Sequence, residues 1–286
     1  MTRPIRIART INELETTLNG WRADGQRIGL VPTMGALHAG HISLVKIIAD
    51  HCDRVVATIF VNPTQFGVQE DLNRYPRDEV TDLAKLEGTG CDLVFMPSVD
   101  DIYPNGSKIT VKAGQAGEGL CGTNRPGHFD GVATVVARLF DICKPDCAIF
   151  GEKDYQQLMV IREMAASEGY DIDILSAPIV RDADGLALSS RNNYLSAEEL
   201  TIAKKLNAIL QHAIRQASAG TALAAVVRDA VIDLRAAGFG AVDYIEFRHG
   251  DTLAPVSGNE LSSGIPVRVF AAVRIGGTRL IDNIAV

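Results

Sequence analysis

The chain has 286 residues, of which 47% are hydrophobic and 22% are charged, and its formal net charge is −7 at pH 7. This composition is typical of a globular enzyme, and the acidic balance disfavours a nucleic-acid partner, which needs clustered Lys and Arg. No apolar run is long enough to span a membrane, and residues 1–13 lack the apolar core of a signal peptide. Five cysteines without framework spacing indicate a reducing compartment and no disulfides. We therefore expect a cytoplasmic protein with no membrane partner.

Short apolar runs alternate with helical patterns along the first two thirds of the chain. The expected strands are 28–31, 54–61, 92–97, 146–151 and 172–175, with a short edge strand at 108–113. The expected helices begin near residue 41 and cover 78–89, 131–143 and 154–167. Continuous apolar strands that alternate with helices predict an α/β fold with a doubly wound parallel, Rossmann-like sheet and right-handed crossovers.

The last third of the chain changes character and predicts a second, smaller α+β domain. Ser196 and Glu199 form a capping-box pattern at the start of a helix. The expected elements are helices at 196–217 and 221–237, followed by strands at 242–248 and 267–275. We expect a nucleotide-binding domain over residues 1–182 and a smaller domain over residues 183–286.

Two histidines follow the first central strand and open the next helix. A strand that turns into a helix N-terminus leaves backbone N–H groups unpaired, which suits an anion. His38 and His41 add directed hydrogen-bond donors, and Gly40 lets a ligand approach the backbone closely. The pattern predicts a phosphate site. Two alternatives are a pair of ordinary histidines and a zinc pair, although the remaining histidines supply no paired spacing for a third ligand.

Two further loops carry groups that suit a nucleotide. In the 151–154 loop, Lys153 can neutralise phosphate charge and Asp154 can accept from a ribose hydroxyl; the alternative is a solvated turn. In the 188–191 loop, two serines and Arg191 suit a phosphate clamp; the alternative is a polar interdomain loop. Gln65 lies at the end of another strand, and His128 is expected to line the same crevice. Because the chain has neither a Walker loop nor Gly-x-Gly-x-x-Gly, these loops indicate attack at the α-phosphate of a nucleoside triphosphate.

These motifs, in this order and spacing, resemble the pantoate–β-alanine ligases (pantothenate synthetases), within the wider group of His-x-Gly-His nucleotidyltransferases. The resemblance runs over nearly the whole chain and rests on residues 32–41, 62–67, 75–77, 125–132, 151–157 and 188–192. It implies that the carboxylate of (R)-pantoate attacks ATP to form pantoyl adenylate and pyrophosphate. The amine of β-alanine would then displace AMP to give pantothenate.

The resemblance also implies roles for individual residues. His41 would be the proton donor, with His38 and Lys153 as further catalytic residues. Gln65 would contact pantoate and then β-alanine, and Gln157 would contact pantoate. The implied ATP contacts are Met34, Gly35, Ala36, Leu37, His38, Ala39, Gly40, His41, Gly151, Glu152, Lys153, Asp154, Val180, Leu188, Ser189, Ser190 and Arg191.

Further implications of the resemblance concern metal and assembly. Mg²⁺ would bridge the phosphates of ATP, assisted by Asp82, although Thr81 stands where some relatives have a second acid. The family also implies a homodimer.

Two rival functions have weaker support. A cytidylyltransferase-like enzyme would share the first motif, but the Gln65 and Gln157 loops suit a small hydroxy acid better than a phosphorylated alcohol. A nucleotide sensor or RNA-binding relative would show a damaged motif or a basic face, and the sequence has neither.

Overall fold

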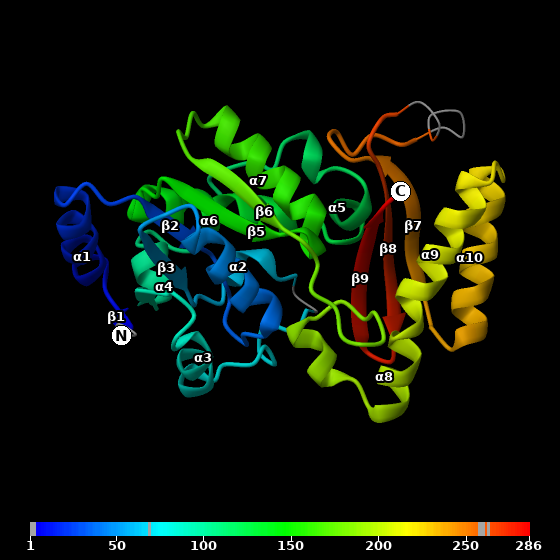
Figure 1. Ribbon diagram of the computed structural model, residues 1–286, viewed down its shortest axis with the longest axis horizontal. Helices are drawn as coiled ribbons and strands as arrows, with labels where there is room; N and C mark the ends of the chain where they lie inside the picture. Colours follow the sequence, from blue (N-terminus) through cyan, green and yellow to red (C-terminus); the bar gives the residue numbers. More distant parts are fainter. Residues whose placement is uncertain (1–3, 68–69, 257–260, 262–263) are drawn as a thin grey trace.

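A six-stranded parallel sheet forms the centre of the larger part of the molecule (Figure 1). The computed structural model describes residues 4–67, 70–256, 261 and 264–286. The strands are β1 (Arg6–Ala8), β2 (Ile28–Val31), β3 (Arg54–Thr58), β4 (Leu93–Phe95), β5 (Cys147–Gly151) and β6 (Asp173–Ala177). Their order across the sheet is β1-β4-β3-β2-β5-β6, with every neighbouring pair parallel. Strands β2 and β4 are buried at every residue, as expected for a sheet covered on both faces.

Helices cover both faces of this sheet, which confirms the predicted doubly wound fold. One apolar cluster joins the sheet to α1 (Ile11–Ala23), α6 (His128–Cys143) and α7 (Tyr155–Ser167). A second cluster on the opposite face joins it to α2 (Ala39–Ala49) and α3 (Glu79–Leu86). Two short helices, α4 (Val99–Ile102) and α5 (Leu120–Asn124), lie in the connection before α6. In the part of the chain that the structure describes, no helix has the length and apolar character needed to cross a membrane.

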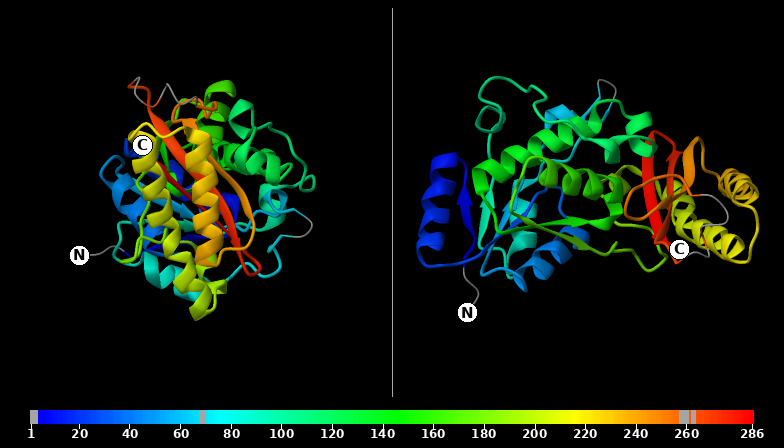
Figure 2. Two further views of the ribbon diagram at one scale, coloured as in Figure 1. Left: turned by 90° about the vertical axis from the view of Figure 1, so that its right-hand side faces the viewer. Right: turned by 90° about the horizontal axis from the view of Figure 1, so that it is seen from above.

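The C-terminal part forms a smaller α+β unit, also as predicted. Its antiparallel sheet contains β7 (Val242–His249), β8 (Val267–Ile275) and β9 (Thr278–Ala285). Its helices are α8 (Ala197–Ala203), α9 (Lys205–Ser218) and α10 (Leu223–Ala237). Figure 2 shows this sheet between the larger body on one side and α9 and α10 on the other. The predicted capping box of Ser196 and Glu199 begins α8.

Several predicted elements differ from the structure. The segment 108–113 is not a strand, because its backbone pairs with side chains of α6: Thr110 and Val111 both donate to Thr134 Oγ1 over 3.2 Å. The helix predicted at 196–217 divides at Lys204 into α8 and α9. Strands β1 and β9 were not predicted. The first has only three residues, and the second follows directly after a tight turn at residues 276–277.

The expectation that the chain has no disulfides is wrong. Cys52, which follows α2, is bonded to Cys147 of β5, although 95 residues separate them in the sequence. They meet because α2 packs on the sheet beside β5. The free cysteines among the described residues, Cys91, Cys121 and Cys143, are buried. The cysteine count therefore gives no support for a reducing compartment.

Gly131 lets α6 touch the 3₁₀ turn η1 (Pro63–Gln65) through backbone atoms. A Cβ at this position would lie 2.3 Å from Thr64 O and 2.8 Å from Gln65 N. We expect Gly131→Ala to lower the free energy of unfolding by about 1–3 kcal/mol, the usual cost of overpacking, measured by urea denaturation. Gly20→Ala in α1 is the control, because its Cβ would have no neighbour within 4 Å and alanine should stabilise the helix. Unchanged stability of the Gly131 variant would contradict this close packing.

Candidate active site

The candidate site lies where the order of the parallel strands changes direction. Strands β2 and β5 are neighbours, yet β3, β4 and β1 extend the sheet on one side and β6 on the other. Connections that leave two such strands in opposite directions open a crevice at their carboxyl ends. Here β2 leads into α2, and β5 leads into the 3₁₀ turn η3 (Glu152–Asp154). A cavity of about 220 Å³ lies at this point and extends to the loop at 188–191.

Most of the predicted site residues line this cavity, although they come from loops distant in the sequence. Those that line it are Met34, His38, Gly40, His41, Gln65, Gly151, Lys153, Asp154, Gln157, Val180, Leu188, Ser189, Ser190 and Arg191. Predicted ATP contacts outside the lining are Gly35, Ala36, Leu37, Ala39 and Glu152. Leu37 is buried in the core beneath α2, and the Glu152 carboxylate binds Arg268 of β8 over 3.0 Å.

The two histidines are locked at the start of α2 by backbone hydrogen bonds. The backbone N–H of Gly40 donates to His38 Nδ1 over 3.1 Å, and that of His38 donates to His41 Nδ1 over 3.2 Å. A neutral ring whose Nδ1 accepts a hydrogen bond carries its proton on Nε2, so these bonds assign the tautomer of both rings. The ring centroids are 4.1 Å apart. The motif therefore presents two neighbouring N–H donors in the cavity.

Burial keeps both rings neutral at physiological pH. The pKa of His38 falls from 6.5 to about 4, first because of burial and then because of the nearby Lys153 ammonium. The pKa of His41 falls to about 3, again through burial, with a further contribution from His38. Neutral imidazoles can stand beside a lysine without repulsion and still donate hydrogen bonds to an anion.

Asp82 shapes the turn that precedes the histidines. Its carboxylate accepts from the backbone N–H of Ala36 over 2.8 Å and from that of Leu37 over 2.7 Å. Asp82 is only 2% exposed, and Gly35 and Ala36 both adopt positive φ to make this turn. The side chain lies outside the cavity lining, and the described residues contain no group of three His, Cys, Asp or Glu that could hold a metal. The structure therefore shows Asp82 positioning the backbone of this turn, and its assistance to Mg²⁺ stays a prediction.

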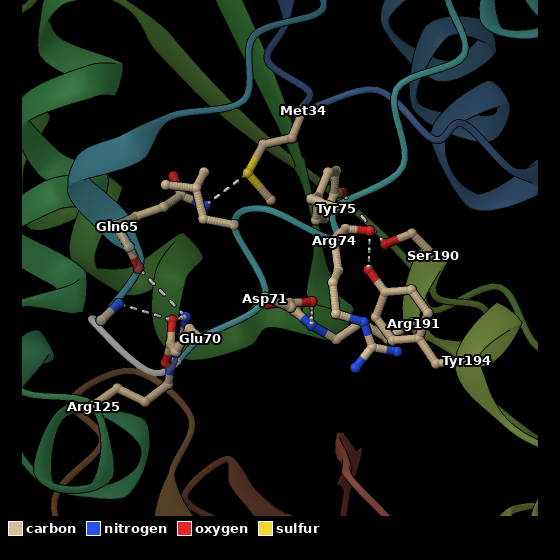
Figure 3. Close-up of polar contacts among 12 residues, drawn as sticks. Met34, Gln65, Glu70, Asp71, Arg74, Tyr75, Arg125, Ser190, Arg191 and Tyr194 are labelled. Carbon is tan, nitrogen blue, oxygen red and sulfur yellow. Dashed lines mark hydrogen bonds and ion pairs between the residues drawn. The ribbon is translucent and has the colours of Figure 1, made fainter.

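The amide of Gln65 is oriented by a residue that the sequence analysis did not select. Asn62, 1% exposed, donates to Gln65 Oε1 over 3.1 Å and to Gly131 O over 3.2 Å. Gln65 Nε2 in turn donates to Met34 Sδ over 2.9 Å (Figure 3). A buried strand that ends in Asn-Pro was the available signal, because a buried polar side chain there must find partners.

Cationic side chains reach the cavity from three loops, and each is paired with a carboxylate; the partner of Arg125 is Glu70. Arg191 donates through Nε and Nη2 to Asp71, over 2.9 Å each (Figure 3). Ser190 donates to the hydroxyl of Tyr75 over 3.3 Å. Lys153 lies 3.8 Å from the Asp154 carboxylate. Burial alone would raise the pKa of Asp154, but the nearby Lys153 and Arg191 outweigh it and lower that pKa, so the carboxylate is ionised.

A doubly wound α/β fold with neutral imidazole donors and cations around one switch-point crevice defines a nucleotide-binding enzyme class. Comparison with known proteins identifies the family within it. The family model described as pantoate-β-alanine ligase matches residues 6–285. The chain therefore belongs to the pantoate–β-alanine ligases, as the resemblance indicated.

Known relatives match along their full length. A pantothenate synthetase from Rhodospirillum rubrum is 49% identical over 284 residues, which cover 99% of this chain and 100% of the relative. The crystal structure of a Thermus thermophilus pantothenate synthetase has a TM-score of 0.89 and 43% identity, covering 98% of this chain and 99% of its own. A Francisella tularensis pantoate-β-alanine ligase, solved with beta-gamma ATP and β-alanine, has a TM-score of 0.81 and 37% identity. The match covers 98% of this chain and 97% of the Francisella chain.

The lowered histidine pKa values predict a loss of stability in mild acid. Unfolded His38 and His41 bind protons below about pH 6.5, whereas the folded rings, with pKa values of about 4 and 3, stay neutral until the pH is far lower. The free energy of unfolding should therefore fall as the pH drops from about 6.5 towards 4, by up to about 1.4 kcal/mol per pH unit for each ring. Urea denaturation at pH 7.5, 6 and 5 measures this slope.

The matched control is the double variant His38→Gln with His41→Gln, which should show a shallower dependence on pH over the same range. A wild-type stability that is constant or rises as the pH falls from 6.5 to 5 would contradict the buried neutral state of the rings.

Proposed function

We propose that this protein condenses (R)-pantoate with β-alanine to give pantothenate, with ATP converted to AMP and pyrophosphate through a pantoyl-adenylate intermediate. The observation that carries the proposal is one cavity lined both by His38 and His41, whose Nε2–H groups are free to donate, and by the cations Lys153 and Arg191. The Francisella tularensis relative, solved with an ATP compound and β-alanine, supports these substrates.

In the first step, a carboxylate oxygen of pantoate forms a bond to the α-phosphorus of ATP, and the bond to the pyrophosphate oxygen breaks. Negative charge increases on the α-phosphate oxygens, where the Nε2–H groups of His38 and His41 would stabilise it. The charge of the leaving pyrophosphate would fall to Lys153 and Arg191. In the second step, the amine attacks the activated carbonyl and AMP leaves, carrying the former carboxylate oxygen.

The contacts are assigned as the family resemblance implies them, and most of these residues line the cavity. ATP would contact the turn from Met34 to His41, the loop from Gly151 to Asp154, Val180 and the loop from Leu188 to Arg191. Gln65 and Gln157 would bind pantoate, and Gln65 would then meet β-alanine. Gln157 lines the cavity, whereas its neighbour Gln156 is buried and binds backbone groups near residue 119.

Magnesium enters the proposal only as an ion carried by the phosphates of ATP, where it would offset their charge. Among the described residues no three metal-binding side chains gather, and both Asp82 oxygens bind backbone N–H groups, so any protein ligand would add to a magnesium ion held mainly by the phosphates. No step is therefore assigned to a metal held by the protein.

The proposal also covers the domain division, the oligomeric state and the cellular location. We place the domain division between residues 182 and 183, with the C-terminal unit closing over ATP. A homodimer rests on the family resemblance. We also propose a cytoplasmic location, where ATP is supplied, although the Cys52–Cys147 disulfide removes the cysteine-based argument for it.

Transfer of oxygen tests the proposed intermediate. Pantoate labelled with ¹⁸O in its carboxylate should pass label to AMP, because one carboxylate oxygen stays on phosphorus when AMP leaves. Mass spectrometry of AMP from reactions with ATP, labelled pantoate and β-alanine measures this, and reactions with CTP serve as the control. Unlabelled AMP alongside pantothenate would exclude the adenylate route.

Arg191→Lys tests the phosphate clamp. Lysine keeps the charge but cannot form the bidentate fork, so we expect the adenylation step to slow by about 10- to 100-fold. Amide formation from preformed pantoyl adenylate should be less affected, because no pyrophosphate is then present. Measuring the two half-reactions separately decides the matter: a variant impaired only in the amine step would show that the 188–191 loop is not the clamp.

A further inference from the structure

Arg125 is held in a rigid frame at the edge of the cavity, beside Gln65. Its Nε donates to Glu70 Oε1 and its Nη2 to Glu70 Oε2, both over 2.6 Å (Figure 3). Its Nη1 lies 2.7 Å from His128 Nε2, and Nη2 is also 3.4 Å from the backbone oxygen of Gln65. One guanidinium edge is therefore occupied by a carboxylate, while the rest of the group is held by other parts of the fold.

His128 holds the Arg125 guanidinium in place without the help of Glu70. Its Nδ1 lies 2.8 Å from the backbone oxygen of Gln65, so Nδ1 donates there and Nε2 accepts from Arg125. The pKa of His128 falls to about 4, first through burial and then through the Arg125 charge, which keeps the ring neutral and able to accept. If Glu70 moved away, the Nε–H and Nη2–H donors of Arg125 (the Arg125 fork) would keep their orientation and could bind another carboxylate.

Three cationic side chains line the cavity within the described ranges: Arg125, Lys153 and Arg191. In the proposed function, Lys153 and Arg191 meet the phosphates, and the pantoate carboxylate must lie at the α-phosphate near the histidines. The carboxylate of β-alanine is then the substrate charge without a cationic partner. Its amine and carboxylate are separated by about 4–5 Å, a few covalent bonds of about 1.5 Å. Because Arg125 contacts the backbone oxygen of Gln65, we expect an amine at Gln65 to leave the carboxylate within reach of Arg125.

A second, larger cleft offers a route for the amine substrate into the cavity. Arg125 and His128 of this cavity, together with Glu70, line the larger cleft of about 800 Å³ between the two parts of the molecule, beside the nucleotide loops. An amine substrate that enters from this cleft would meet the Arg125 fork before it reaches the acyl group at Gln65.

We propose that Arg125 is the carboxylate-binding residue for the amine substrate, and that Glu70 occupies this subsite as an internal carboxylate until the substrate replaces it. The inference rests on the proposed function and adds the group that selects an ω-amino acid over a simple amine. His128 is a positioning residue that orients the fork.

Substituting Arg125 and substituting Glu70 should change the use of β-alanine in opposite directions. Arg125→Gln removes the receptor, so kcat/KM for β-alanine should fall by roughly 30- to 300-fold, as expected for losing a bidentate charged pair. Glu70→Gln removes the internal competitor, so the KM for β-alanine should fall by about threefold or more, because more of the protein is ready to bind. A purely structural ion pair would instead raise the KM in both variants.

The experiment compares β-alanine with 3-aminopropanamide, which has the same amine but a neutral end. Wild type, Arg125→Gln, Arg125→Lys and Glu70→Gln are assayed for amide formation with each amine, and for pantoate-dependent exchange of pyrophosphate into ATP. We expect wild type to prefer β-alanine and Arg125→Gln to lose that preference, with the exchange rate lowered much less than the rate of amide formation from β-alanine. Arg125→Lys should be intermediate, since it keeps the charge without the fork.

Arg54→Gln is the matched control for breaking a half-buried ion pair. Arg54 and Asp92 are 14% and 16% exposed, against 15% and 26% for Arg125 and Glu70, and Arg54 begins β3 at the end of the strand opposite the cavity. This variant should keep the wild-type preference between the two amines. If Arg125→Gln does not fold, Arg125→Lys and Glu70→Gln still test the inference.

The outcomes separate the two proposals. A wild type that makes no pantothenate would overturn the proposed function and this inference with it. A wild type that makes pantothenate, with an Arg125→Gln variant that still prefers β-alanine over its amide, would overturn this inference alone. A raised β-alanine KM in Glu70→Gln would also overturn it.

Discussion

The site depends on the hydrogen bonds that the Nδ1 atoms of His38 and His41 accept from backbone N–H groups at the start of α2, those of Gly40 and of the N-cap residue His38. These bonds satisfy donors that a helix start would otherwise leave unpaired, and they leave each ring with its proton on Nε2. Because burial keeps the rings neutral, they can lie beside the Lys153 ammonium and still offer hydrogen bonds to a phosphate. Residues 38–41 therefore both begin the helix and supply the hydrogen-bond donors for an anion.

The smaller α+β unit takes part in shaping the nucleotide loop. Asn283 of β9 donates to the backbone oxygens of Glu152 and Lys153 over 2.9 and 3.0 Å. Arg268 binds the Glu152 carboxylate from β8, and Arg181 binds Asp282 through two bonds of 2.7 and 2.8 Å. The loop that carries Lys153 is therefore positioned by a sheet more than a hundred residues further along the chain. Movement of that sheet would move a group that is proposed to bind phosphate.

The parts of the fold that the sequence predicted well are those with strong local patterns. Strands β2, β4 and β5 are continuous apolar runs, and α8 begins at a capping box, so local chemistry alone favours these elements. Three of the errors share one cause, which is that partners distant in the sequence decided the outcome. The segment 108–113 pairs with side chains of α6, β1 exists because β4 provides its ladder, and Cys52 reaches Cys147 only across packed elements.

The same distinction applies to the site. The sequence by itself determined which loops carry anion-binding chemistry, because a strand end, a helix start and a histidine, lysine or arginine lie within a few residues of one another. Tertiary structure alone decided how those groups are paired. Asp82 binds the turn before the histidines, Asp71 binds Arg191, and Glu70 binds Arg125, over separations of 45 to 120 residues. A carboxylate can serve a metal, a backbone turn or an arginine with the same local sequence, and only the folded chain brings one of these partners within hydrogen-bond distance.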